Sequence, residues 1–173
     1  GRVDGNCLPD LKQLLFELGE TSVSFELYYD SEWVQRGAYF VHHRRRFLQT
    51  WNAVSELELP IGTVLDLGGA GPVAAYLAGI GWNFCGTNVD LRGPLPIPNQ
   101  CLDLALCTEV IEHIKDIDSS EITDLEAFNY SGVMNMLCEI RRMLKPSGLL
   151  LITTPNAASM HMLAKWLYGE LLL

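Results

Sequence analysis

The sequence lacks the features that mark secreted, membrane-spanning and nucleic-acid-coating proteins. Its 173 residues hold 12 lysines and arginines against 21 acidic residues, a net charge of −9, so it has no excess positive charge to attract phosphate backbones. No basic segment followed by an apolar one opens the chain, and no uncharged stretch approaches the roughly 20 residues of a membrane span. The only basic cluster is Arg44-Arg45-Arg46, which we interpret as a solvated helix face.

Paired cysteines are also missing. Five cysteines are an odd number, and none shows the Cys-x-x-Cys spacing of metal or redox sites. We therefore expect reduced, buried thiols in a cytoplasmic protein. The first residue is not a natural start, and the last three leucines have no helix cap, so we expect a fragment.

Two patterns of apolar residues divide the chain. Up to Pro60 the apolar residues recur at helical spacing, which predicts a helical cap over 1–60. From Thr63 short apolar runs alternate with helical stretches, which predicts a doubly wound, mostly parallel α/β sheet over 61–173. We expect strands at 63–67, 83–88, 102–107 and 149–154, helices at 73–78, 110–114, 133–144 and 157–168, and a stiff surface connection at 93–98.

A glycine-rich turn occupies residues 66–72, Asp-Leu-Gly-Gly-Ala-Gly-Pro, where the first expected strand becomes a helix. Bare N–H groups and the positive end of a helix dipole meet there, so a nucleotide or a carboxylate can dock. Residues 69–74 also satisfy the dinucleotide pattern G-x-G-x-x-G/A. Asp66 separates the alternatives, because its charge repels a pyrophosphate and attracts the amino group of a cofactor that carries an amino acid.

Four blocks of the sequence resemble class I S-adenosylmethionine-dependent methyltransferases. Residues 64–71 resemble the first motif, 102–113 the fourth strand and its following helix, 144–152 the entry to the fifth strand, and 154–156 the tripeptide after it. The first motif departs from the family at Ala70, where a second glycine is usual, and at Pro72. The resemblance implies S-adenosylmethionine as cofactor, and a sheet that lacks the last two of the usual seven strands.

The resemblance also implies cofactor-binding residues. Asp66, Gly68, Gly69 and Ala70 would hold the methionine part, Asn88 or Asp90 the ribose, and Asp90, Leu91 and Cys107 the rest of the nucleoside site. If both Asn88 and Asp90 keep their family roles, a helix and a strand between them are absent. Either this is a genuine deletion, or residues are missing between Asn88 and Val89, which we favour because the loss would open the adenine side of the pocket.

Glu109, Glu112 and His113 are the candidate catalytic residues. Their spacing predicts one common helical face beside the transferring methyl, with His113 as base towards an acceptor hydroxyl and Glu109 orienting it. The same block resembles the metal site of small-RNA 2′-O-methyltransferases, which needs a further histidine. His161 is the nearest candidate, and we assign no metal.

The acceptor that we expect is a small molecule or a sugar or glycan, methylated on oxygen. Residues 115–124 form either a lid or a solvated loop, and Tyr28, Tyr29, Trp33, Tyr39 and Phe40 either roof the cofactor or belong to the core. Three other functions stay open: metal-dependent RNA 2′-O-methylation, against which the negative charge argues, a non-catalytic scaffold, and a dinucleotide oxidoreductase, which the later blocks do not support.

Overall fold

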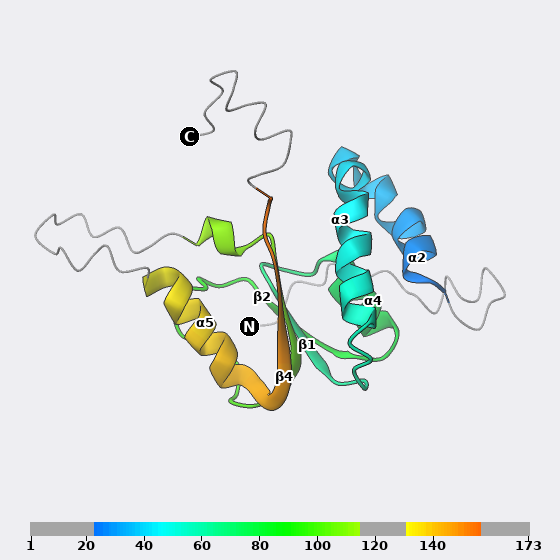
Figure 1. The fold of residues 1–173 in the computed structure, drawn as a ribbon. Coiled ribbons are helices and arrows are strands. Elements are labelled where there is room, and N and C mark those ends of the chain that lie inside the picture. The colour runs from blue at the N-terminus through cyan, green and yellow to red at the C-terminus, as the bar shows by residue number, and fades with distance from the viewer. Residues whose placement is uncertain (1–22, 115–130, 157–173) are drawn as a thin grey trace, which may run out of the picture.

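A computed structural model describes residues 23–114 and 131–156 (Figure 1). The predicted helical cap comprises α2 (Phe25–Glu32), the 3-10 helix η1 (Val34–Arg36) and α3 (Ala38–Ser55). The alternating part follows with β1 (Thr63–Leu67), α4 (Pro72–Gly79), β2 (Asn83–Thr87), β3 (Leu102–Thr108), η2 (Ile111–His113), α5 (Ser131–Met143) and β4 (Leu144–Thr153). The predicted first strand is confirmed in full.

The four described strands form one parallel sheet in the order β2-β1-β3-β4. Helices α2, α3 and α4 cover one face of it, and α5 covers the other (Figure 1). The predicted doubly wound α/β architecture is therefore confirmed. Within residues 23–114 and 131–156, no helix is both long and apolar enough to cross a membrane.

The side chains of β1 and β3 point alternately to the two faces of the sheet, so the core consists of two layers. Val64, Leu104 and Leu106 pack under the helical cap and α4, while Leu65 and Ala105 pack under α5. Successive side chains of a strand point to opposite faces, so Asp66 shares the face of Val64. That placement directs its carboxyl group towards the cap.

The helices begin and pack for local reasons. The Ser24 hydroxyl caps α2 by accepting from Leu27 N at 3.3 Å, and Pro72 begins α4, where its fixed φ suits a first helical residue. Met136, Ile140 and Met143 recur on one side of α5 and are almost fully buried against the sheet. An apolar stripe of this kind stabilises a helix mainly through tertiary packing.

The connection from β2 to β3 contains no helix or strand, and α5 holds it. Leu91 and Leu95 are buried, so the expectation of a purely surface connection at 93–98 is wrong at Leu95. Glu139 accepts from Leu95 N at 2.8 Å, and Arg142 donates to the carbonyls of Leu95 and Ile97 at 3.0 and 2.8 Å. The expectation of additional residues between Asn88 and Val89 stays a prediction.

Several predicted elements have other boundaries. The helix expected at 110–114 is the short η2, the second strand ends one residue before Asn88, and β4 begins at Leu144 rather than Leu149. The helix at 157–168, the segment 115–124 and residues 1–22 of the cap lie outside the described residues. Cys85, Cys101, Cys107 and Cys138 are free thiols. Of these four, Cys107 alone is buried as expected, whereas Cys85 and Cys101 are half-buried and Cys138 is exposed.

Candidate functional site

The glycine turn connects β1 to α4 in a conformation that needs glycine. Gly68 and Gly69 have φ of 91° and 122°, values that side chains rarely tolerate. A Cβ on Gly68 would lie 3.1 Å from the Val110 side chain, whereas one on Gly69 would have no heavy atom within 4 Å. The turn therefore presents bare backbone at the carboxyl ends of β1 and β3, where ligands bind in open α/β sheets.

Asp66 is a buried acid behind this turn. It is 3% exposed, and its Oδ2 accepts from Gly71 N at 2.7 Å. Burial raises the pKa of Asp66 to about 7, and the Gly71 hydrogen bond offsets part of that shift. A cationic group of a ligand would favour the charged form of Asp66 and so bind at this point.

A cavity of about 260 Å³ lies over the turn. Its lining residues come from the turn, from the cap and from the end of β3: Trp33, Tyr39, Phe40, Arg46, Phe47, Asp66, Leu67, Gly68, Gly69, Ala70, Gly71, Pro72, Thr108, Glu109 and Val110. The four residues predicted to hold the methionine part of the cofactor therefore share one cavity. Its roof is aromatic and its floor is backbone.

Glu109 stands where β3 ends, in a left-handed conformation with φ of 55°. Its N–H donates to the carbonyl of Thr153 at 3.0 Å, and its Oε1 accepts from the Thr153 hydroxyl, also at 3.0 Å. Arg46 Nη1 of α3 lies 3.4 Å from its Oε2. Such a conformation costs of order 1–3 kcal/mol for a non-glycine residue and persists where surrounding contacts fix it.

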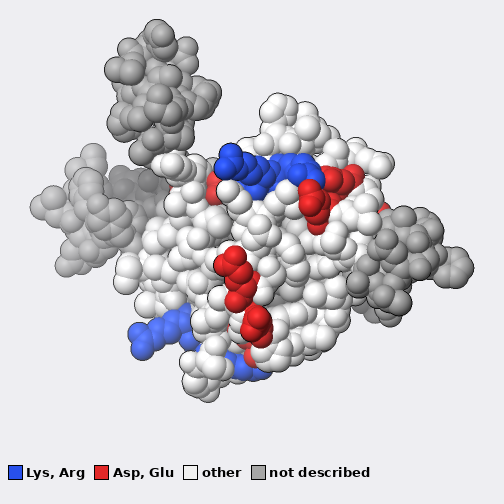
Figure 2. Space-filling view, turned by 45° about the vertical axis from the view of Figure 1, so that its right-hand side comes forward, with Lys and Arg blue, Asp and Glu red and all other residues white. Residues whose placement is uncertain are grey.

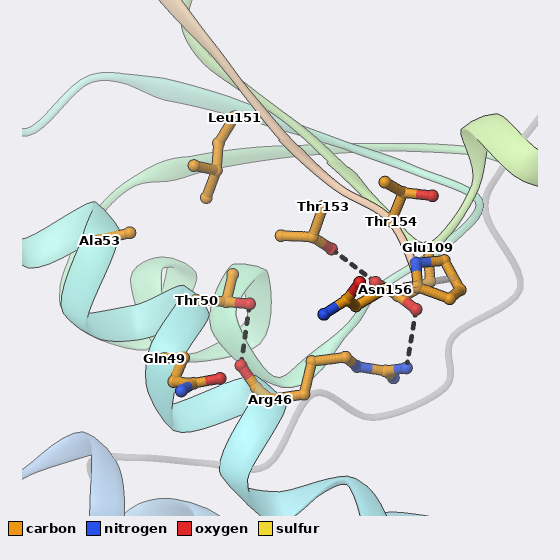
Figure 3. Close-up of a pocket in the computed structure, with 10 residues that line it drawn as sticks. Arg46, Gln49, Thr50, Ala53, Glu109, Leu151, Thr153, Thr154 and Asn156 are labelled. Atoms are coloured by element: carbon orange, nitrogen blue, oxygen red, sulfur yellow. Dashed lines mark hydrogen bonds and ion pairs between the residues drawn. The ribbon is translucent and has the colours of Figure 1, made fainter. Parts of the chain in front are cut away.

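A second cavity, of about 350 Å³, lies between α3 and the end of β4 (Figure 3). It is lined by Arg46, Gln49, Thr50, Ala53, Glu109, Leu151, Thr153, Thr154, Pro155 and Asn156. Arg46 and Glu109 belong to both linings, so this ion pair forms a wall common to the two cavities. Hydroxyl and amide groups dominate the polar part of the second lining.

The family model for a methyltransferase domain matches residues 39–171, which include all but the first residue of α3, the glycine turn and the end of β4. The chain belongs to this methyltransferase family. The chain also shares its fold with the PH0226 protein from Pyrococcus horikoshii OT3, at a TM-score of 0.51 and 19% identity. That match covers 73% of this chain and 62% of the other, so this chain spans less than two thirds of that protein. No curated protein matches this chain.

Not every predicted cofactor residue lies at the cavity over the glycine turn. Asn88 and Asp90 are exposed beyond β2, and hydrogen bonds from Arg92 lower the pKa of Asp90 to about 2. Leu91 and Cys107 are buried in the core layer under α5. The structure thus joins the predicted methionine-binding residues but leaves the predicted nucleoside-binding residues outside the lining of this cavity, and their roles stay predictions.

The expectation of one helical face for the three catalytic candidates is wrong. Glu109 lies before η2 with left-handed backbone, and only Glu112 and His113 belong to that 3-10 helix. The His113 side chain is 77% exposed, which contradicts a packing role, and its Nε2 is 4.0 Å from Glu112 Oε1. Neither Glu112 nor His113 lines either of the two cavities. Among the residues that the structure describes, no group of three or more acids, histidines and cysteines is arranged to hold a metal ion.

The interpretation of Arg44-Arg45-Arg46 as a solvated face holds only for Arg45, which is exposed. Arg44 pairs with Asp30 and Glu26 of α2, each at 2.6 Å, and Arg46 lines both cavities. The sequence signal that Arg46 faces inward is its helical spacing. Arg46 lies four residues before the buried Thr50 and seven before Ala53, which places the three on one face of α3.

The aromatic residues of the cap divide between the two predicted roles. Trp33, Tyr39 and Phe40 line the first cavity. Tyr28 and Tyr29 belong to the core, and the Tyr29 hydroxyl donates to the carbonyl of Phe40 at 2.7 Å. The hydrogen bond of Tyr29 therefore holds the start of α3, which carries Tyr39 and Phe40, in place beside the first cavity.

Proposed function

We propose that the chain transfers a methyl group from S-adenosylmethionine to an oxygen of a small-molecule or sugar acceptor. The observation that carries this proposal is the cavity over the glycine turn, in a chain of a methyltransferase family. Bare backbone at Gly68 and Gly69 allows close approach of the methionine part, and Asp66 attracts its ammonium group.

The protein's contribution to the reaction is alignment and exclusion of water. S-adenosylmethionine supplies a methyl group on a positively charged sulfonium, and the positive charge disappears during in-line displacement. Trp33, Tyr39 and Phe40 cover the proposed cofactor cavity and limit the access of water. No covalent intermediate with the enzyme is needed.

We assign the acceptor to the second cavity because it adjoins the first through Glu109. Its threonine hydroxyls and its amides suit a neutral, hydroxylated acceptor. Glu109 is the carboxylate that reaches both cavities, so we propose that it accepts the acceptor's hydroxyl proton as the new oxygen–carbon bond forms. Glu112 and His113 stay as predicted catalytic residues, with His113 the alternative base.

RNA methylation is the weaker alternative. On the face in Figure 2 the basic side chains form separate groups, with acidic side chains beside the upper one, rather than one continuous basic surface. Together with the net charge of −9, this arrangement disfavours binding to a phosphate backbone. A scaffold without activity would bind cofactor but produce no methylated product.

Calorimetry with S-adenosylhomocysteine, S-adenosylmethionine and NAD tests the proposed cofactor. We expect the first two to bind and NAD to give no signal. Gly68→Val should abolish binding, because its Cβ would press on Val110 at a φ that valine avoids. Gly93→Ala is the matched control, since its Cβ would make only an ordinary contact of 3.9 Å. Binding of NAD alone would overturn the proposal.

Two further expectations remain proposals. We propose that residues 1–60 act as a helical cap on a methyltransferase core at 61–173. We also propose a cytoplasmic location, supported by free thiols at Cys85, Cys101, Cys107 and Cys138.

A further inference from the structure

The second cavity is polar at one end and apolar at the other (Figure 3). The Arg46–Glu109 pair stands at one end. Ala53 of α3 and Leu151 of β4 lie together at the opposite end, and both are half-buried. Their side chains carry no polar atom. The apolar end therefore offers a ligand van der Waals contact and shelter from water, but no side-chain hydrogen bond.

The geometry of α3 and β4 sets the distance between the two ends. Ala53 follows Arg46 by seven residues, which is about two turns or 10 Å along the helix. Leu151 precedes Thr153 by two residues, which is about 7 Å along the strand. The Thr153 hydroxyl in turn donates to Glu109 Oε1 at 3.0 Å. The apolar end thus begins about 7–10 Å from the Glu109 carboxylate.

The threonine hydroxyls in the middle of the lining do not make the far end polar. The Thr50 hydroxyl donates to the carbonyl of Arg46, one turn earlier in α3, at 3.0 Å, and so is directed back along the helix. The Thr153 hydroxyl donates to Glu109. The Asn156 side chain lies on the side of Glu109. The polar groups are therefore gathered near Glu109, and Ala53 and Leu151 form a separate apolar surface.

We propose that Ala53 and Leu151 form an apolar subsite of the acceptor cavity. The acceptor is then amphipathic: a neutral hydroxylated molecule that carries an alkyl or aryl group about 7–10 Å from the methylated oxygen. This inference rests on the proposed function and specifies the class of acceptor within it. Ala53 is the specificity-determining residue, because its small side chain leaves the space that the apolar group occupies.

Two pairs of probes that differ only in an alkyl chain test the inference. One pair is phenol and 4-butylphenol, and the other is methyl and butyl β-D-glucopyranoside. In both butyl probes a six-membered ring separates the chain from the hydroxyl opposite it. In an assay of S-adenosylhomocysteine formation, kcat/KM should be about 10- to 100-fold higher for the butyl member of a pair that the enzyme methylates, because each buried methylene adds to binding.

Two variants change the space in the subsite in opposite directions. Ala53→Leu should fill it and reduce the preference for the butyl probes to within about twofold, while phenol and methyl glucopyranoside keep their wild-type kcat/KM. Leu151→Ala should enlarge it and favour the hexyl homologues over the butyl probes. Ala38→Leu is the matched control, because it makes the same substitution at an exposed position of α3 that lines neither cavity, and it should keep the wild-type preference.

If Ala53→Leu unfolds before it can be assayed, Leu151→Ala decides through the change in preferred chain length. Unsubstituted probes that react at least as well as the butyl probes would overturn the inference. So would a butyl preference that neither variant at the subsite changes, or transfer to none of the probes by a protein that binds S-adenosylhomocysteine. In each of these cases cofactor binding still supports the proposed function. A protein that binds neither S-adenosylhomocysteine nor S-adenosylmethionine in calorimetry refutes the proposed function itself, so the two failures are distinguishable.

Discussion

Replacement of Asp66 by asparagine should make the protein's stability less dependent on pH. The folded-state pKa of Asp66 is about 7, because burial opposes its charge. In the unfolded chain its pKa returns to about 3.9. A carboxyl whose pKa is raised by folding stabilises the folded state below the unfolded pKa, and this stability is lost as the pH rises towards the folded pKa.

The difference of about three pKa units corresponds to about 4 kcal/mol in total, of which about 2.5 kcal/mol is lost between pH 5 and pH 8. The asparagine side chain in the Asp66→Asn variant has nearly the same shape, keeps an oxygen for the Gly71 N–H and carries no charge. The free energy of unfolding of the variant, relative to wild type, should therefore rise by about 2.5 kcal/mol over this range.

Urea unfolding followed by circular dichroism at pH 5, 6, 7 and 8 measures this difference. Asp103→Asn is the control. Burial favours a higher pKa for Asp103, but hydrogen bonds from Lys145 and from Thr63 N outweigh it and lower the pKa. Its contribution is lost only as the pH falls through that low pKa, so its effect should be constant above pH 5. A constant effect for Asp66→Asn would refute the reasoning from burial.

Three other predictions concern catalysis and packing. In an assay of S-adenosylhomocysteine formation with hydroxylated acceptors, Glu109→Gln should lower turnover by about 10²–10⁴-fold. The His113 side chain is exposed, so His113→Ala should keep the wild-type melting temperature. A loss of turnover in His113→Ala but not in Glu109→Gln would make His113 the base. Arg142→Ala should lower the free energy of unfolding by about 1–3 kcal/mol in urea, because it removes hydrogen bonds to the β2–β3 connection. Tyr76→Phe should cost about 1 kcal/mol in the same assay, since its hydroxyl donates to a main-chain carbonyl before α2; an unchanged midpoint would contradict that role.

The periodicity of the sequence predicted the sheet well, because buried parallel strands are continuous apolar runs. The run at β1 matches its strand in full, and the glycines after it mark the turn. The pattern failed at 110–114, where local spacing favoured a helix. The actual conformation depends on Glu109, whose N–H is bonded to Thr153 across the sheet, a contact between residues 44 positions apart.

The site was predictable only where it consists of local backbone. Asp66 and the glycines belong to one short motif, so their proximity follows from the sequence. Arg46 lies 20 positions before Asp66, and its place in both linings depends on how α3 packs across the end of the sheet. Helical spacing gave the faces of α3, but it did not say which face meets the cavities.

The aromatic roof also equips the protein with a fluorescent reporter of its own. Trp33 lines the first cavity, with its ring 5.0 Å from that of Phe40 and the Arg36 guanidinium 4.3 Å above it. A ligand that enters this cavity changes the surroundings of the indole and hence its emission. Trp51 instead lies 5.2 Å from the Phe25 ring and 4.8 Å from the Tyr76 ring, so its emission follows the packing of the cap. Tryptophan fluorescence of one sample therefore reports both ligand binding and unfolding. Trp33→Phe should remove the change in emission on ligand binding and keep the change on unfolding.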